Sequence, residues 1–408
     1  MKRLFGLSII MFLSLIFVSC EEEGPPVLPG LVKSTLSVAT QPPNATIVIN
    51  NRQSGKTSPG DLSELEPGFY RIDLKLNTYL DTTYYYLIKR GVRDTISVEM
   101  REDPAYWWQI FRKESHPIPT NSFNKVMIDS AGVKHLSATS FGLVIFDNAS
   151  WTNYTRTNSP LPSNTINDMH KTGGVLWIAT DAGLVRFDGS IWTVYNAANS
   201  GLPSNYITAV TSDKRGRIWF GSDNGGLVVF DGVVFRIYNT FNSAVPSDNV
   251  TALFSDTEGN IWAGTWGEGV YKFDGTTFET FNNYNKGLVS NFIRHITADK
   301  NGSIWIASGN FSGGGGLSRI TNGFLTNFTQ FNSGFRGSIV TGIQFDKYNN
   351  PWVTTADAGL MFREGSRWRQ YIRENSGMPS ASALSVAIDQ DGSKWVVSDF
   401  LSKYIGYR

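Results

Sequence analysis

Histidine is the side chain best suited to acid–base chemistry near neutral pH, and this chain has four: His116, His135, His170 and His295. No two of them have the spacing of a metal-binding pair, and the chain lacks a nucleophile elbow, a phosphate-binding loop and a dinucleotide-binding fingerprint. We therefore expect no catalytic constellation, no metal site and no cofactor. An acid–base pairing of His295 with Glu268 stays open as the enzymatic alternative.

The only cysteine, Cys20, follows an N-terminal apolar stretch. Lys2 and Arg3 precede the apolar residues 4–18, a segment too short to span a bilayer and laid out like a secretory signal. Residues 17–20, Phe-Val-Ser-Cys, resemble a lipobox, in which the cysteine thiol takes a lipid after cleavage. We therefore expect a signal peptide over residues 1–19 and a lipid on Cys20. The alternative is an ordinary secretory signal with an incidental cysteine.

A tether is predicted next, over residues 20–32, because proline and glycine at this density favour an extended chain. The three residues after the cysteine, Glu21 to Glu23, are similar to the surface-export signal of lipoproteins in some Gram-negative bacteria. A solvated spacer is the alternative reading of this acidic cluster. The expected location is the cell envelope, as an outer-membrane lipoprotein that faces either the periplasm or the cell surface.

Aromatic, carboxylate and amide side chains recur in segments rich in glycine, where packing does not call for large rings. Flat aromatic faces beside carboxylates and amides suit a sugar ring or an extended peptide. The alternative is that the rings only fill space between neighbouring units. The candidate ligand-binding residues are Phe141, Asp181, Asp223, Asn224, Trp266, Glu268, Asn310, Phe311, Asp357 and Asp399.

A second set of polar residues occupies the second position of predicted strands whose first position is nearly always apolar. Its members are Lys125, Asn167, Thr208, Thr251, Arg294, Thr341 and Ser385. Polar side chains in buried elements require partners, and we expect water or a ligand in a central channel to supply them. Lys125 and Arg294 would place two positive charges there. The alternative is a water-filled channel without a specific partner.

The elements that must position these residues form a repeat. Residues 207–238 contain four short apolar runs separated by turns rich in aspartate and glycine, namely 207–210, 218–220, 227–230 and 235–238. This pattern predicts a four-stranded meander, and His135 occupies the place of its second-strand tryptophan in the first copy. The other copies carry that tryptophan at Trp177, Trp219, Trp262, Trp305, Trp352 and Trp395.

Seven copies need seven fourth strands, and the aromatic-x-x-aromatic pattern of that strand follows the second strand in six of them. Residues 108–111, Trp-Gln-Ile-Phe, have the same aromatic spacing and precede the first copy. A ring in which this strand completes the last copy leaves no open sheet edge. The prediction is an all-β fold: a seven-bladed β-propeller of four-stranded blades over residues 103–408, closed by an N-terminal strand.

The repeats resemble the two-component-regulator propellers found in sensor portions of bacterial hybrid signalling proteins. The likeness lies in Gly-x-Ile-Trp-x-Gly-(Ser/Thr), then Gly-Leu or Gly-Val, then Phe-Asp-Gly, as in residues 216–232 and 259–275. The resemblance implies a ligand-sensing module but names no ligand. Streptogramin lyases have similar blade repeats, so the resemblance also leaves a lyase-like enzyme open.

A separate small β domain is predicted over residues 33–100, from alternating runs at 35–40, 45–50, 70–76, 82–87 and 95–100. Its central stretch resembles the PEGA domain, a small β-sandwich module of surface proteins. The likeness lies in residues 45–50, in Gly55, Thr57 and Pro59, and in Leu-Glu-Pro-Gly at 65–68. The resemblance implies a spacer or docking domain without catalytic chemistry.

A net charge of +1 argues against nucleic acid as a partner of the whole chain. No kinase, receiver or helix-turn-helix pattern is found, so we expect another protein to relay any signal. The leading hypothesis is a lipid-anchored envelope sensor whose propeller binds a glycan or peptide on one rim, with a separate signalling or uptake protein as partner. A lyase-like enzyme and a structural surface or adhesion protein are the alternatives.

Overall fold

The computed structural model describes residues 32–310 and 314–406. The predicted signal segment and Cys20 lie outside this part of the chain. The chain divides into two compact units, Met1–Glu102 and Asp103–Arg408. No helix among the described residues has the length and apolar character needed to cross a membrane.

The first unit is a β-sandwich. Its strands are β1 (Ser34–Gln41), β2 (Thr46–Ile49), β3 (Arg52–Thr57), β4 (Gly60–Leu65), β5 (Gly68–Lys75), β6 (Thr82–Ile88) and β7 (Arg93–Glu99). They form one sheet in the order β4-β1-β7 and a second in the order β3-β2-β5-β6. Leu36 of the first sheet shares a core with Ile72 and Leu74 of the second. The sequence pattern missed β3 and β4, because these edge strands are largely polar and exposed.

The second unit is a seven-bladed β-propeller, as predicted: the described residues after Glu102 form seven four-stranded sheets. Blades 1 to 4 are β9 (Phe123–Ile128), β10 (Lys134–Ala138), β11 (Gly142–Phe146) and β12 (Trp151–Tyr154); β13 (Ile166–Thr172), β14 (Val175–Thr180), β15 (Gly183–Phe187) and β16 (Trp192–Tyr195); β17 (Ile207–Ser212), β18 (Ile218–Ser222), β19 (Gly226–Phe230) and β20 (Phe235–Tyr238); and β21 (Val250–Ser255), β22 (Ile261–Thr265), β23 (Val270–Phe273) and β24 (Phe278–Phe281).

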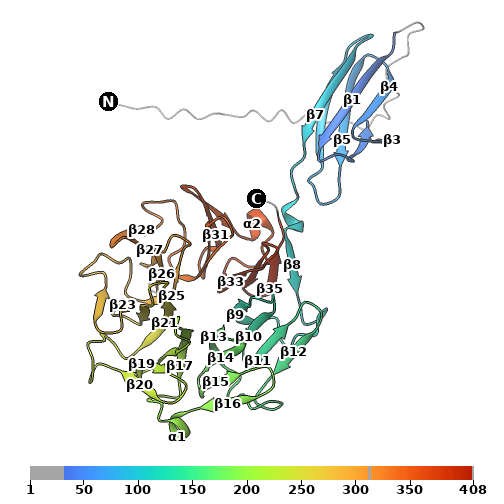
Figure 1. The fold of residues 1–408 in the computed structure, drawn as a ribbon. Helices are drawn as coiled ribbons and strands as arrows, with labels where there is room; N and C mark the ends of the chain where they lie inside the picture. Colours follow the sequence, from blue (N-terminus) through green and yellow to red (C-terminus); the bar gives the residue numbers. More distant parts are fainter. Residues whose placement is uncertain (1–31, 311–313, 407–408) are drawn as a thin grey trace, which may run out of the picture. The chain divides into compact units, whose positions relative to one another are not determined.

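Blades 5 to 7 continue the series, and short helical turns occur at η1 (Pro104–Tyr106), α1 (Ala197–Ser200) and α2 (Arg373–Ser376). The strands are β25 (Ile293–Ala298), β26 (Ile304–Ser308), β27 (Gly316–Thr321) and β28 (Phe324–Phe328); β29 (Val340–Phe345), β30 (Pro351–Thr355), β31 (Gly359–Glu364) and β32 (Arg367–Tyr371); and β33 (Ser385–Ile388), β34 (Lys394–Val397) and β35 (Leu401–Tyr404), with β8 (Trp108–Phe111). The first strand of each blade contacts the first strand of the next, including β33 with β9 (Figure 1).

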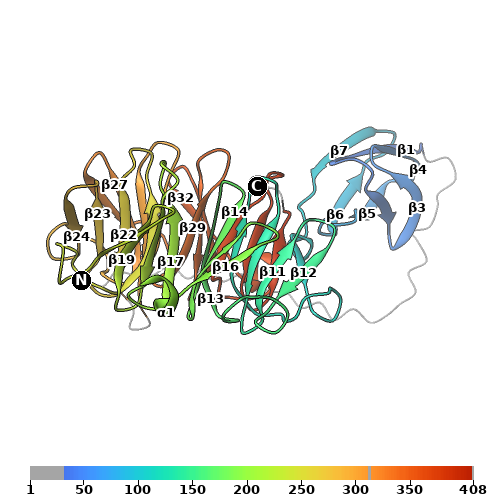
Figure 2. The same cartoon turned by 60° about the horizontal axis from the view of Figure 1, so that its bottom comes forward.

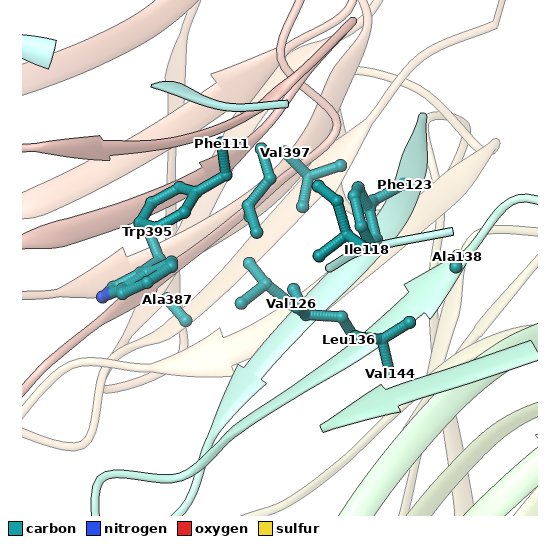
Figure 3. Close-up of a cluster of buried hydrophobic side chains, with 11 residues drawn as sticks. Phe111, Ile118, Phe123, Val126, Leu136, Ala138, Val144, Ala387, Trp395 and Val397 are labelled. Atoms are coloured by element: carbon teal, nitrogen blue, oxygen red, sulfur yellow. The ribbon is translucent and has the colours of Figure 1, made fainter. Parts of the chain in front are cut away.

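The ring closes by the predicted strand exchange. β8 pairs antiparallel with β35, so a strand from the N-terminal side becomes the fourth strand of blade 7. Phe111 stacks on Trp395 at a centroid distance of 4.9 Å. Both rings belong to a core cluster that also contains Val126 and Leu136 of blade 1 (Figure 3). Closure therefore buries apolar side chains of the first and last blades together.

In six of the blades, a hydrogen bond among the described residues joins the hairpin between strands one and two to the second strand. In blade 4, Trp262 donates its indole N–H to the Asp256 carboxylate at 2.9 Å. The same bond joins Trp219 to Asp213 and Trp305 to Asp299. In blade 1, His135 replaces the tryptophan and bonds Asp129 at 3.0 Å. The repeated aspartate therefore satisfies a buried indole as well as capping a turn.

The propeller has two rims, which are the ends between which the strands run in Figure 2. The hairpins between strands one and two lie on the hairpin rim. The loops between strands two and three lie on the opposite rim, called the loop rim here. There they bond to the segments before each first strand, since Asp223 N donates to the Tyr206 carbonyl and Trp266 N to the Asn249 carbonyl. This pairing brings the two kinds of loop together on one rim.

Candidate functional site

The axis of the propeller contains two adjoining cavities of about 450 Å³ each. The loop-side cavity opens toward the loop rim, and its described lining residues are Asn124, Lys125, Val126, Asn167, Tyr206, Thr208, Thr251, Trp266, Ile293, Arg294, His295, Thr341, Gly342, Ile343, Gln344, Leu384, Ser385 and Val386. The hairpin-side cavity shares several of these, including Lys125, Arg294 and His295, and adds Asp168 and His170. All seven residues of the predicted channel set line the loop-side cavity.

A β-bulge in the first strand positions the channel set. In blade 3 the pairing with the second strand shifts between Ile207 and Ala209, so Thr208 has no partner across the ladder. A bulge of this kind turns a side chain out of the regular alternation. The equivalent shifts leave Asn167, Thr251, Arg294 and Thr341 unpaired in the ladder.

In blades 1 and 7, the predicted channel residue lies one position after the one that corresponds to the bulge in the other blades. In blade 1 the shift falls at Asn124, while Lys125 pairs with Ser137. In blade 7 Ser385 pairs regularly with Val397. The sequence could not reveal this offset, because a β-bulge is a feature of strand pairing and is not marked in the amino-acid sequence. Lys125 and Ser385 still line the cavity from the next position of the strand.

Most of the channel set is satisfied by the protein itself, contrary to the expectation of water or ligand. Asn167 donates to the Ile207 carbonyl at 2.7 Å, and Thr251 to the Ile293 carbonyl at 2.7 Å. Thr341 donates to the Ala383 carbonyl at 2.8 Å, and Thr208 bonds the Val250 carbonyl. Each bond runs from one blade to the first strand of the next or, for Thr341, to a residue two positions before that strand. These side chains therefore link neighbouring blades, which is a structural role.

Charged groups gather in the channel between blades 1 and 2. Lys125 forms an ion pair with Asp168, whose carboxylate also accepts the Val210 backbone N–H at 3.0 Å. His170 lies nearby and bonds the Ser212 hydroxyl at 2.8 Å. Burial lowers the pKa of His170, with Lys125 adding to the decrease and Asp168 opposing it. The imidazole is therefore neutral at neutral pH.

His295 lies in the channel wall of blade 5 and faces both cavities. Burial lowers its pKa to about 4, with Lys125 adding to the decrease and Asp168 opposing it. Its Nδ1 is buried and has no hydrogen-bond partner among the described residues. The ring therefore borders both cavities as a neutral polar group, while its Nδ1 atom is enclosed by protein.

The mouth of the loop-side cavity carries an aromatic–cation cluster. Trp266 is 46% exposed and lies edge-on to Phe292 of the next blade at 5.2 Å. The Arg294 guanidinium lies 5.4 Å from the centre of the Trp266 ring. Arg294 Nε also donates to the Gly309 carbonyl at 2.7 Å. The indole therefore packs on its neighbours on one side and remains open to solvent on the other.

The other candidate rim residues do not join this mouth. Among the described candidates, only Trp266 lines the loop-side cavity. Asp357 and Asp399 line a separate pocket of about 370 Å³ between blades 6 and 7, where Asp357 accepts the backbone N–H groups of Ser338 and Ile339. Phe311 lies outside the described residues. The remainder are exposed or half-buried on separate loops: Phe141, Asp181, Asp223, Asn224, Glu268 and Asn310.

The pairing of His295 with Glu268 is not formed. Glu268 is exposed and lines neither cavity, while His295 lies in the channel wall. Trp266 and Glu268 lie two residues apart in one glycine-rich loop, but of the two only Trp266 lines the loop-side cavity. No cluster of metal-ligating residues occurs within the described residues.

Sequence reasoning missed three polar or aromatic lining residues, Asn124, Tyr206 and Gln344. Tyr206 directly precedes the first strand of blade 3, where the loops converge on the rim. Its place before a strand in the repeat was a usable signal. Gln344 gave no such signal, because the equivalent first-strand position is chemically varied in the other blades, as Met127, His170 and Thr211 show.

Comparison with known families agrees with both resemblances drawn from the sequence. The PEGA domain model matches residues 33–102, which is the described sandwich. The two component regulator propeller model matches residues 201–224, 244–267 and 287–310. Each of these three segments runs through the first two strands of a blade and ends in its loop-rim segment. No curated protein sequence matches the chain.

Solved structures share the fold at low sequence identity. The extracellular domain of a candidate hybrid two component system from B. thetaiotaomicron is 19% identical, with a TM-score of 0.64 over 85% of this chain and 52% of that one. PorZ, a surface component of the type-IX secretion system of Porphyromonas gingivalis, is 14% identical, with a TM-score of 0.56 over 85% and 59%. This chain therefore spans about half of the length of the first of these structures.

A third similar structure is an enzyme. It is a catalytically inactive virginiamycin B lyase from Staphylococcus aureus with quinupristin, in which a histidine is replaced by alanine. It is 14% identical, with a TM-score of 0.56 over 72% of this chain and 98% of that one. At such identities the likeness establishes the propeller fold alone.

Proposed function

We propose that this protein is a lipid-anchored recognition module of the cell envelope. Its propeller binds a glycan or peptide at the mouth of the loop-side cavity. A separate signalling or uptake protein then receives the signal. The match to regulator propellers and the likeness to an extracellular domain of a two component system support a sensing role over a purely structural one.

The observation that carries the proposal is the cavity of about 450 Å³ with a half-exposed tryptophan at its mouth. Ligand sites are concave, largely pre-formed and lined by aromatic groups with a few fixed polar groups. Trp266 supplies an aromatic face, and Tyr206 lines the same cavity. The inter-blade bonds of Thr208 and Thr251 hold the wall rigid, so the site is formed before a ligand arrives.

The test is a glycan and peptide array followed by calorimetry on the positive members. Replacing Trp266 by alanine should weaken binding about tenfold or more, because a stacked ring typically contributes roughly 1–3 kcal/mol. Phe331→Ala is the matched control, since this ring is 90% exposed and lies outside both cavities. Equal losses in the two variants, or no binding to any array member, would contradict the proposal and favour a structural or adhesion role.

A lyase-like enzyme is the second candidate, favoured by one observation. His295 borders the channel in a fold that a lyase also uses, and that lyase loses activity when a histidine is replaced. Turnover of quinupristin that His295→Ala abolishes would support this candidate. The exposed Glu268 is not its partner, so another group must supply the second proton-transfer step.

The anchor is tested separately. Cys20→Ser removes the thiol that would take the lipid, so the variant should move from the membrane fraction to the soluble fraction after signal cleavage. The control is a Glu22→Ser variant, which leaves the thiol in place and should stay with membranes. A Cys20→Ser protein that still sediments with membranes after its signal segment has been removed would disprove lipid anchoring.

A further inference from the structure

The charged side chains among the described lining residues of the loop-side cavity are all cationic. Lys125 and Arg294 line it from blades 1 and 5, and none of its described lining residues is an aspartate or glutamate. The remaining polar lining consists of hydroxyl, amide and imidazole groups. Asp168, the partner of Lys125, lines only the hairpin-side cavity. An entering group therefore meets cations before it meets any carboxylate of the channel.

Lys125 can serve two partners at once. An ammonium group has three N–H donors, and the ion pair with Asp168 is the one side-chain bond of Lys125 among the described residues. Its side chain is 30% exposed, although it lies at the boundary of the two cavities. The ammonium therefore has donor capacity toward the loop side.

Two further groups frame the same space. Arg294 presents its guanidinium beside the Trp266 ring at the mouth, so a charge and a flat apolar face lie side by side. The buried Nδ1 of His295 has no partner within the described part of the chain. Partly desolvated charges act more strongly than exposed ones, because the surrounding protein is less polarisable than water.

We infer that the loop-side cavity binds the carboxylate of a small acidic ligand between Lys125 and Arg294, with the attached ring or chain against Trp266. This inference rests on the proposed recognition function and specifies its ligand chemistry. A carboxylate can accept hydrogen bonds from both cations, and charge-assisted bonds are roughly twice as strong as neutral ones. The carboxylate can come from a uronic-acid saccharide or from the free C-terminus of a peptide.

Matched ligand pairs distinguish these sources and isolate the charge. Calorimetry on the full chain compares a galacturonic acid disaccharide with its neutral galactose counterpart. A second pair compares a tripeptide bearing a free C-terminus with its C-terminal amide. In one pair the acid form should bind at least tenfold more tightly than the neutral form, and the preference should shrink as salt is raised. The pair that shows the preference identifies the source.

Two substitutions alter the cavity charge in opposite ways. Arg294→Gln removes a cation, and Gln344→Glu adds an anion to the same wall with almost no change in shape. Each should weaken binding of the acid ligand at least tenfold more than it weakens binding of the neutral counterpart. Arg236→Gln is the matched control, because it removes one charge from an exposed position on β20 and should change neither. Melting temperatures identify any variant that fails to fold, and the remaining one then decides.

The outcomes separate this inference from the proposed function. Equal binding of acid and neutral forms, with both weakened by Trp266→Ala, would overturn the carboxylate site and leave recognition intact. Failure of both acid ligands to bind at 10 mM, while neutral array members bind at Trp266, would also overturn the carboxylate site and leave recognition intact. Failure of every array member would overturn both.

Discussion

The hairpin rim and the loop rim of this propeller are made by the same repeats, yet their side chains behave differently. On the hairpin rim an aspartate recurs in blade after blade and accepts the indole N–H of the second strand, as Asp256 does from Trp262. On the loop rim the loops between strands two and three hold different side chains, among them Phe141, Asp223 and Trp266. Repeated chemistry thus marks the groups that build each blade, and divergent chemistry marks the surface free to recognise a ligand.

The same contrast applies along the channel. Thr208 and Thr251 occupy equivalent bulges and make equivalent bonds to the next blade. Arg294 occupies the same bulge but bonds the Gly309 carbonyl of its own blade and contacts Trp266. Among blades 2 to 6, the exception to the repeated inter-blade bond is therefore Arg294, at the cavity mouth.

The largest expected effect concerns closure of the ring. A chain that begins at residue 113 lacks β8, so it should lose about 5 kcal/mol or more of unfolding free energy relative to one that begins at residue 101. Trp108 and Phe111 are both buried, and removing a buried aromatic side chain costs about 3–5 kcal/mol. Chemical denaturation of the two truncations measures the difference. Equal midpoints would mean that β8 does not close the blade.

Two tryptophans four residues apart test the contrast directly. Trp262→Ala should cost about 3–5 kcal/mol of stability, because the indole is buried in the core. Trp266→Ala should cost less than about 1.5 kcal/mol, since only an edge contact and a cation–π contact are lost. Urea unfolding of both variants gives the comparison. A greater loss for Trp266 would place it in the core and remove the anchor of the proposed site.

The hairpin rim has its own test. Asp256→Ala should cost about 2 kcal/mol, because the indole N–H of Trp262 and the turn amides lose their acceptor. Asp274→Ala is the matched control: its carboxylate caps the turn at Thr276 and Thr277 and accepts no indole. Its loss should be the smaller of the two in thermal unfolding. The reverse order would show that turn capping, and not the indole bond, explains the repeated aspartate.

A smaller effect is expected from pH. The pKa of His295 is about 4 in the folded state and near its ordinary value of 6.5 in the unfolded chain. Between pH 4 and pH 6.5 the unfolded chain therefore binds a proton that the folded chain does not. Stability from this group is therefore complete above pH 6.5 and is lost as pH falls toward 4. We expect a loss of about 1–2 kcal/mol between pH 7 and 5 that His295→Gln removes. His135 and His170 remain in both proteins, so the difference between their denaturation curves isolates His295.

Much of the fold could be predicted from sequence because propeller interactions are local and repeated. The regular return of a tryptophan, of Phe-Asp and of turn residues fixed the blades, and the aromatic spacing of Trp108 and Phe111 identified the closing strand. The sandwich strands β3 and β4 escaped notice because they are short, polar and at sheet edges. Alternation is visible in a sequence only where one face of a strand is buried.

The candidate site, like the fold, could be predicted from the sequence only in part. Sequence alone determined which first-strand residues line the axis, because their positions follow from the repeat period. Only the tertiary structure decided what those residues do. Neighbouring blades supply the acceptors for Thr208 and Thr251, whereas Trp266 and Arg294 meet at the mouth and Glu268 remains outside. These roles depend on the positions of β-bulges and on contacts between residues some 42 positions apart. Neither can be read from the order of residues alone.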